Sequence, residues 1–223
     1  MSAIAYFHKL AGVHDTTSHF IIRKIMQGLA KTHASADLRV PITPETLLAL
    51  VHSAQATATS IYDQHLFPTM FTLMFHGFLR IGEVTESPHN ILYHQVAWSA
   101  NAISLTFKTF KHHTGQPVTL SNPAALMPAA CPVLLLSNYV RIQGSRLGPL
   151  FCDGSNRPVT QARFQNILRT ALAHANLTAL HITPHNFRIV AATCAATKGM
   201  STQQIQAIGR WQSLAFQKYI RIT

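Results

Sequence analysis

Acidic residues are scarce in this chain. Its 223 residues include only 7 Asp and Glu against 18 Lys and Arg, which gives a formal net charge of +11. The shortage is also local, because the stretch from Gly154 to Thr223 holds no Asp or Glu but contains Lys and Arg throughout. Cations without nearby carboxylates require anions from elsewhere, and nucleic-acid phosphates carry that charge. The sequence therefore predicts a polyanionic partner, with nucleic acid ahead of an acidic membrane surface.

Cysteine is also scarce, and its spacing excludes two classes of protein. The three Cys, at positions 131, 152 and 194, form no CxxC pair. This excludes the disulfide framework of small secreted domains and the common zinc motifs. The 14 His include His112-His113 as the only tight pair, and there is no HExxH motif. We therefore expect no metal site and no metal cofactor.

Long uninterrupted apolar segments are missing as well. Lys9, His14 and Asp15 interrupt the first 30 residues, so no signal peptide is expected there. The uncharged stretch 115–140 is broken by prolines and does not predict a membrane helix. Since 48% of the residues are nevertheless apolar, the composition predicts a globular protein without a membrane partner.

The pattern of caps, turns and apolar residues predicts a mainly α fold with one small antiparallel β-sheet. The polar stretch 33–39 looks like a linker, so we expect domains at 1–38 and 39–223. Strand-like runs occupy 91–98, 102–108 and 117–120. Helices are expected over 1–31 (with an apolar stripe through Phe20, Ile21, Ile25 and Leu29), from Thr43-Pro44, over about 64–81, after Pro132, from Thr160 to about His174, from Thr183-Pro184 to Gly199, from Ser201 to about Ile208, and around Phe216 to Ile220.

Arg80 and Glu83 form the first motif that could carry chemistry. Arg80 follows an apolar segment, and a guanidinium at the edge of a core can clamp a phosphate in bidentate fashion. Glu83, three residues later, would share a helical face with Arg80 and could fix its orientation. An ordinary structural ion pair remains the alternative.

Two further motifs supply cations. Lys108 and Lys111 follow a strand-like run, where either side chain could reach into a groove, although a solvated hairpin Lys is the simpler alternative. In Thr183-Pro-His185-Asn-Phe-Arg188, a cap at Thr183 would put His185 and Arg188 at a helix start, where backbone N–H groups favour an anion. A histidine packed at a helix start is the alternative there.

Trp211 and Tyr219 are the last two candidate residues along the sequence. Each could simply pack in the core, which is the usual role of a large aromatic side chain. The order of the motifs, Arg…Lys…His-x-x-Arg…Trp…Tyr, nevertheless resembles the tyrosine recombinase (phage integrase) family from about Pro41 to the end. The stretches 185–193 and 208–213 resemble most the integrases of eukaryotic mobile elements, the DIRS-like retrotransposons and the cryptons. Residues 1–38 resemble part of that family's helical core-binding domain.

The resemblance implies a tyrosine recombinase catalytic-domain fold and a role for each matching residue. Tyr219 would attack the scissile phosphate and form a covalent 3′-phosphotyrosine link, without a metal or ATP. The implied catalytic residues are Arg80, Lys108 (or Lys111) as general acid, His185, Arg188, Trp211 and Tyr219, with Glu83 in support. The basic residues expected to bind DNA are Lys111, Arg157, Arg163, Arg210 and Lys218.

The resemblance also implies partners and a location. Double-stranded DNA is the expected substrate, with self-association as a dimer or tetramer on DNA, and nuclear localisation follows from the likeness to mobile elements. Two rival functions share the basic surface: a non-catalytic DNA-binding relic of a mobile element, and a topoisomerase IB-like enzyme that relaxes supercoils. An RNA-binding module is a third, but no RRM, KH or zinc-knuckle motif supports it.

Overall fold

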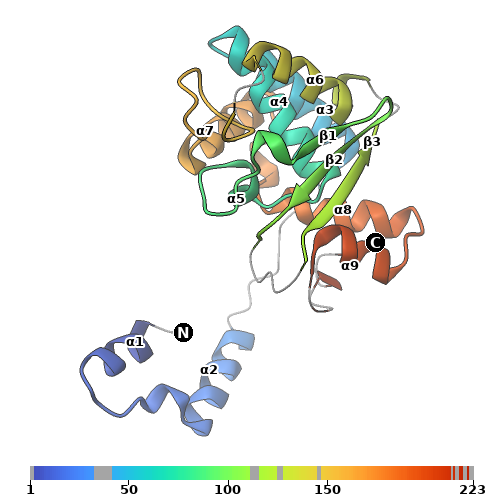
Figure 1. Ribbon diagram of the computed structural model, residues 1–223. Coiled ribbons are helices and arrows are strands. Elements are labelled where there is room, and N and C mark those ends of the chain that lie inside the picture. The colour runs from blue at the N-terminus through green and yellow to red at the C-terminus, as the bar shows by residue number, and fades with distance from the viewer. Residues whose placement is uncertain are drawn as a thin grey trace. The chain divides into compact units, whose positions relative to one another are not determined.

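The chain forms two compact units, Met1–Leu38 and Arg39–Thr223, in a computed structural model (Figure 1). The structure describes residues 3–32, 42–110, 116–124, 128–144, 147–211, 213, 216–217 and 220. Each unit is described by itself.

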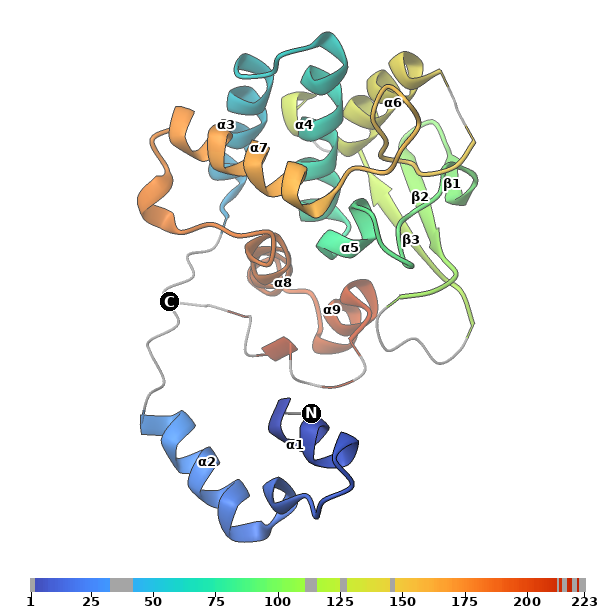
Figure 2. The same cartoon turned by 90° about the vertical axis from the view of Figure 1, so that its left-hand side faces the viewer.

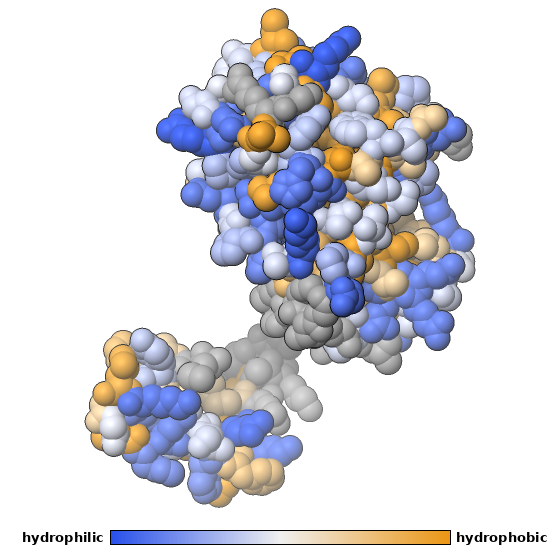
Figure 3. Space-filling model, viewed as in Figure 1, coloured by the Kyte–Doolittle hydropathy of each residue, from blue (hydrophilic) through white to orange (hydrophobic). Residues whose placement is uncertain are grey.

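The first unit consists of short helices joined by a turn. Its elements are α1 (Ala3–Leu10), the 3-10 helix η1 (Thr16–Ser18) and α2 (Phe20–Thr32). Gly12 has a φ of 65°, a left-handed conformation that ends α1, so the helical region expected over 1–31 is interrupted. The apolar stripe predicted on α2 lies on the surface, with Phe20 69% and Ile25 56% exposed. Figure 3 shows apolar atoms on the outside of this unit.

The second unit packs helices on both sides of one buried helix. Its helices are α3 (Pro44–Ala56), α4 (Ile61–His76), α5 (Ile81–Val84), α6 (Pro132–Gln143), α7 (Gln161–His174), α8 (Asn186–Thr197) and α9 (Thr202–Gly209), with 3-10 turns η2 (Tyr93–Gln95), η3 (Pro128–Ala130) and η4 (Thr178–Leu180). Every residue from 66 to 75 in α4 is buried, and this helix contacts α3, α6 and α8. An apolar surface on all sides is typical of a core helix.

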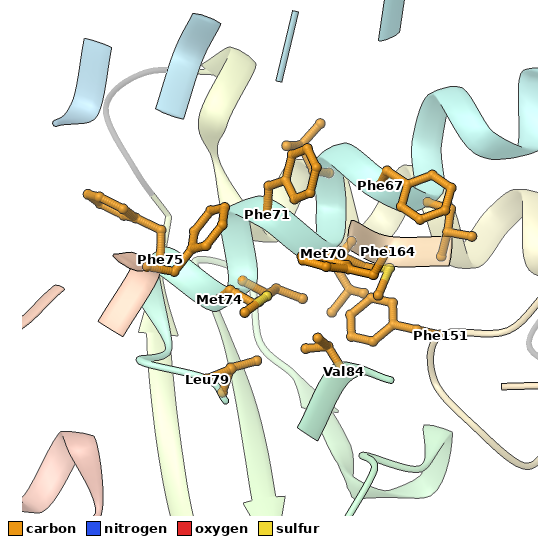
Figure 4. Close-up of a cluster of buried hydrophobic side chains, with 14 of the residues drawn as sticks. Phe67, Met70, Phe71, Met74, Phe75, Leu79, Val84, Phe151 and Phe164 are labelled. Carbon is orange, nitrogen blue, oxygen red and sulfur yellow. The ribbon is translucent and has the colours of Figure 1, made fainter. Parts of the chain in front are cut away.

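Large side chains of α4 form the centre of this core. Phe71 lies edge-on to Phe164 of α7, with ring centroids 5.4 Å apart, and stacks on Phe187 of α8 at 5.7 Å. Figure 4 shows Met70 and Met74 in the same cluster of buried side chains as Phe71 and Phe164. The core therefore ties α8 to α4, and α8 carries the predicted site residue Arg188, with His185 at its N-cap.

A three-stranded antiparallel sheet lies beside α6. The strands are β1 (Val96–Trp98), β2 (Ala102–Phe107) and β3 (Val118–Pro123), in the order β1-β2-β3. Alternate residues of β2 are buried, and β2 and β3 contact α6. The predicted fold class, mainly α with a small antiparallel sheet, is confirmed. The first strand is shorter than predicted because η2 occupies residues 93–95.

The helix expected over about 64–81 divides in two, which changes the setting of Arg80. Gly77 ends α4, and Phe78 has a φ of 52°, a left-handed conformation that no helix continues. Arg80 is consequently the N-cap of α5, with extended backbone angles. The expectation that Arg80 and Glu83 lie within one helix is wrong, although a different contact still joins them.

The start of α8 also differs from the expectation that Thr183 caps it. The helix begins at Asn186, and Thr183 donates both its backbone N–H and its hydroxyl to the Asn186 side-chain oxygen, at 2.9 and 2.7 Å. The cap is thus a side chain of the helix that reaches back to the preceding turn. His185 occupies the N-cap position.

Other predicted helix ends are confirmed. Thr43, Thr160 and Ser201 each accept a hydrogen bond from the first turn of α3, α7 and α9. Gly199, with a φ of 77°, follows the end of α8. In the described ranges no helix is long and apolar enough to cross a membrane.

Candidate active site

Glu83 sits at the centre of a buried ionic cluster at the start of α5. One carboxylate oxygen, Oε2, accepts the backbone N–H of Arg80 at 2.8 Å, and the other, Oε1, accepts Arg80 Nη1 at 3.1 Å. The Glu83 side chain is 2% exposed and that of Arg80 is 22% exposed. The carboxylate therefore caps the helix and orients the guanidinium, whose outer edge reaches solvent.

Arg210 is the second cation of this cluster. Its Nη2 donates to Glu83 Oε2 at 2.6 Å, and its side chain has no exposed surface. The guanidinium also packs over the Phe107 ring, 4.1 Å from the centroid. Burial lowers the pKa of Arg210 and the Glu83 carboxylate opposes that shift, so the guanidinium stays charged. The backbone oxygen of Arg210 accepts Arg80 Nη2 at 3.4 Å, which joins the two arginines a second time.

Arg188 and Trp211 lie against the same cluster. Arg188 donates to the Phe78 oxygen at 2.5 Å and to the Gly209 oxygen at 2.8 Å, and it is 3% exposed. Its guanidinium carbon lies 4.5 Å from the centroid of the Trp211 ring, a cation–π contact. Arg188 thus joins the turn after α4 to the end of α9. Figure 2 shows α8 and α9 adjacent to one another near α5.

The backbone at the end of α9 permits this packing. A Cβ atom on Gly209 would overlap the ring of Trp211, so only glycine allows the indole to fold back over the helix end. Arg210, with a φ of 53°, then turns the chain through a left-handed conformation. Trp211 is held further by stacking on Phe216, with centroids 5.2 Å apart, and by an edge contact with Phe78 at 6.1 Å.

Lys108 and His185 lie close in sequence to residues of the cluster. Lys108 is exposed and directly follows Phe107, the residue whose ring covers Arg210. His185 is half-buried at the N-terminus of α8, three residues before Arg188. The structure thus joins Arg80 directly to Glu83 and Arg188 directly to Trp211. Arg210 and the neighbouring Gly209 connect the two pairs, since Arg210 bonds to Arg80 and Glu83 and the Gly209 oxygen accepts from Arg188. Lys108 directly follows Phe107, and His185 precedes Arg188 by three positions at the start of the same helix.

Three predicted residues lie outside the described ranges. They are Lys111, Lys218 and Tyr219. Their predicted roles are neither supported nor opposed by these contacts.

The prediction that Arg210 binds DNA is wrong, because a side chain without exposed surface cannot reach a phosphate. Arg163 donates to both oxygens of Asp63 at 2.8 and 2.9 Å and packs over Phe67. Its guanidinium therefore has an ionic partner within the protein. Arg157 is 77% exposed and pairs with Asp153 at 3.0 Å, which leaves it able to meet DNA. The expectation that the basic C-terminal stretch lacks internal counter-charges fails here, since these carboxylates come from earlier in the chain.

This arrangement suits the binding of one phosphodiester. Two arginines, one half-buried and one buried, are fixed by a carboxylate and by backbone oxygens. Preorganised cations of this kind stabilise the extra negative charge of a phosphoryl-transfer transition state. In the described part of the chain no group of three His, Cys, Asp or Glu side chains could hold a metal ion.

The model of the phage integrase family matches residues 41–223. The chain belongs to the phage integrase family. Curated protein sequences give no match. The match covers the whole second unit apart from its first two residues.

Three structures illustrate the shared fold. XerH recombinase bound to its difH substrate superposes with a TM-score of 0.64 at 14% identity, covering 82% of this chain and 50% of XerH. XerA recombinase gives 0.62 at 18% identity, covering 98% and 76%. A lambda integrase dimer bound to a COC′ core site gives 0.59 at 15% identity, covering 97% and 62%. The chain thus spans half the length of XerH, and at these identities the likeness concerns the fold.

Sequence reasoning missed the structural role of Arg210. The residue was assigned to the DNA surface because it is basic and lies in a stretch without acids. Its partner Glu83 lies 127 positions earlier, a pairing that no local pattern indicates. The sequence feature that could have indicated this role is Gly209-Arg210-Trp211, because a glycine two residues before a tryptophan lets the indole fold back over the helix end.

Proposed function

We propose that this phage integrase family chain is a site-specific DNA recombinase that cleaves and rejoins strands through a covalent 3′-phosphotyrosine intermediate. The observation that carries the proposal is the cluster in which Arg80, Glu83, Arg188 and Trp211 converge. These residues come from separate stretches of sequence, and their order matches the family motif, which supports the proposal that they form one site. Stability alone does not explain why Arg80 and Arg210 share one buried carboxylate, since their like charges repel.

The proposed reaction is an in-line displacement at phosphorus. The Tyr219 oxygen forms a bond to phosphorus while the bond to the 5′-oxygen breaks, and the phenol proton passes to a base for which His185 is the proposed group. Lys108 supplies a proton to the leaving 5′-oxygen, with Lys111 as the alternative donor. The reverse attack by a 5′-hydroxyl of another strand restores the phosphodiester and frees Tyr219. Since one ester replaces another, no external energy source is required.

Arg80 and Arg188 differ in how they would meet the phosphate. The exposed edge of Arg80 can bind a non-bridging oxygen directly. Arg188 is covered by Trp211 and bonded to two carbonyl oxygens, so its contact with phosphate requires the Trp211 segment to shift when DNA binds. Until then, Arg188 contributes positive charge from beneath the site.

The wider biology belongs to the same proposal. The chain would act on double-stranded DNA, associating with further copies as a dimer or tetramer. The Gly209-Arg210-Trp211 sequence and the stretch 185–193 support descent from a eukaryotic mobile element of the DIRS or crypton type, which implies action in the nucleus. Residues 1–38 would contribute part of the clamp that holds DNA.

A covalent-capture experiment tests the nucleophile. Double-stranded oligonucleotides with randomised sequence and a nick near the centre are incubated with the protein, because loss of the short nicked fragment prevents religation. We expect the wild type to form adducts that resist denaturation and that yield a consensus on sequencing. Tyr219→Phe should form none, because phenylalanine has no oxygen to attack phosphorus.

Tyr93→Phe serves as the matched control, since Tyr93 lies in η2, away from the motif residues in sequence, and should leave the adduct yield unchanged. Adducts from Tyr219→Phe would contradict the assignment of the nucleophile. Sequence-selective binding by the wild type without any adduct would instead favour a non-catalytic DNA-binding protein.

A further inference from the structure

We propose that Arg210 is a positioning residue that keeps Arg80 aligned and its site positively charged, by sharing the Glu83 carboxylate. This inference rests on the proposed function of the site. It assigns a role to a residue that cannot itself touch DNA, because its side chain has no exposed surface.

The first argument concerns charge. Glu83 binds Arg80 through both carboxylate oxygens, and a lone Arg–Glu pair is electrically neutral. A neutral pair attracts a phosphate weakly. Arg210 adds a second guanidinium to the same carboxylate at 2.6 Å, so the three groups together carry one positive charge. Since Arg210 is buried and Arg80 is exposed at its outer edge, the surplus charge acts through Arg80.

The second argument concerns geometry. Arg210 meets the cluster with its side chain and with its backbone. Its side chain fixes Glu83, and its carbonyl oxygen accepts Arg80 Nη2 at 3.4 Å. The same guanidinium packs on Phe107, the residue before Lys108, at 4.1 Å. Arg210 therefore links the proposed phosphate clamp to the strand end that carries the proposed general acid.

The third argument concerns burial. A guanidinium removed from water is costly to the fold unless it is paired and hydrogen-bonded. Arg210 also donates to the Ile208 oxygen at 3.2 Å, yet its Nε lies buried without an acceptor in the structure. An apolar side chain could fill this position at a lower desolvation free energy. The retention of a buried arginine is explained if its charge acts on the neighbouring site.

The test measures the cleavage rate at saturating protein, where differences in binding do not contribute. Four forms of the full chain are compared: wild type, Arg210→Met, Glu83→Gln and the double variant. The probe is a nicked duplex recovered by covalent capture with the wild-type protein. We expect Arg210→Met to lower the single-turnover cleavage rate at saturating protein by about tenfold or more, because the Glu83 charge then offsets Arg80.

The double variant separates charge from structure. Glutamine at position 83 can still accept the Arg80 backbone N–H but carries no charge to offset Arg80. Replacing Arg210 should therefore lower the cleavage rate only slightly once position 83 is neutral. The double variant should then cleave faster than Arg210→Met alone. A purely structural role predicts the opposite, since two disturbed residues would be no better than one.

A modified substrate gives an independent readout. Replacing one non-bridging oxygen of the scissile phosphate by a methyl group removes the charge that the arginines stabilise. The rate difference between wild type and Arg210→Met should then shrink to about twofold or less. Arg210→Lys, which keeps a buried charge, should retain more of the normal rate than Arg210→Met does.

The control for stability alone is Leu50→Ala in α3, a fully buried core position outside the ionic cluster. It should lower the melting temperature without changing the ratio of rates on the two substrates. If Arg210→Met fails to fold, Arg210→Gln and the double variant replace it, since neither leaves an apolar group against the Glu83 carboxylate.

The outcomes are distinct. Equal losses on both substrates, or a folded double variant no faster than Arg210→Met or Arg210→Gln, would overturn the role of Arg210. Absence of adduct from the wild type would instead reject the proposed function, so the two failures can be told apart.

Discussion

Gly209 decides whether Trp211 can lie over Arg188. It is the last residue of α9, a position where alanine would normally favour the helix. Here the indole folds back so closely that a Cβ atom would overlap its ring. Local helix propensity and tertiary packing therefore make opposite demands at this residue, and packing determines the outcome.

We expect Gly209→Ala to lower the free energy of unfolding by about 1–3 kcal/mol, because an added methyl group must displace the Trp211 ring. Urea denaturation measures the loss, and near-UV circular dichroism reports the altered setting of the indole. Gly154→Ala is the control, since space around Gly154 is open, and it should change stability by less than about 0.5 kcal/mol. An equally stable Gly209→Ala protein would contradict the crowded packing.

Elements whose ends depend on local chemistry could be predicted from the sequence. Thr43 followed by Pro44, and Ser201 followed by Gln204, supply their own hydrogen bonds to α3 and α9. The break after α4 could not be predicted in this way, because it depends on Phe78, a residue type that rarely adopts a left-handed conformation. Its buried ring packs against Trp211, which offsets the strain.

The start of α8 offers a direct test of which residue forms the cap. Asn186→Ala removes both hydrogen bonds that Thr183 donates, whereas Thr183→Ala removes only the hydroxyl bond. We expect Asn186→Ala to lower the free energy of unfolding by about 2 kcal/mol and Thr183→Ala by about 1 kcal/mol or less. Denaturant midpoints of the two variants measure this difference. The reverse order would show that Thr183 caps the helix after all.

The site itself was only partly predictable from sequence. The order of Arg80, His185, Arg188 and Trp211 indicated the family, and the contacts bring most of them together. The ionic partners could not be foreseen, since Arg163 and Asp63 are 100 positions apart and meet only through the packing of α7 on the start of α4.

At the scale of the whole molecule, three of the few carboxylates form ion pairs with arginines of the basic C-terminal stretch. Asp63, Glu83 and Asp153 hold Arg163, Arg210 and Arg157, so the basic C-terminal stretch is balanced in part from elsewhere. The net charge of +11 remains, because cations outnumber acids by 18 to 7. The excess must therefore be carried by other Lys and Arg side chains, which would release condensed counterions from DNA on binding.

We expect the logarithm of the DNA association constant to fall linearly and steeply with the logarithm of salt concentration, measured by fluorescence anisotropy with a mixed-sequence duplex. Arg157→Gln should reduce that slope by about one if the exposed guanidinium meets a phosphate. Asp153→Asn is the reciprocal variant: it keeps an acceptor for the turn but loses the charge that holds Arg157, so DNA affinity should rise.

A flat salt response would mean that the surplus charge does not face DNA. An unchanged slope in Arg157→Gln would mean that Arg157 pairs with Asp153 and does not contact a DNA phosphate.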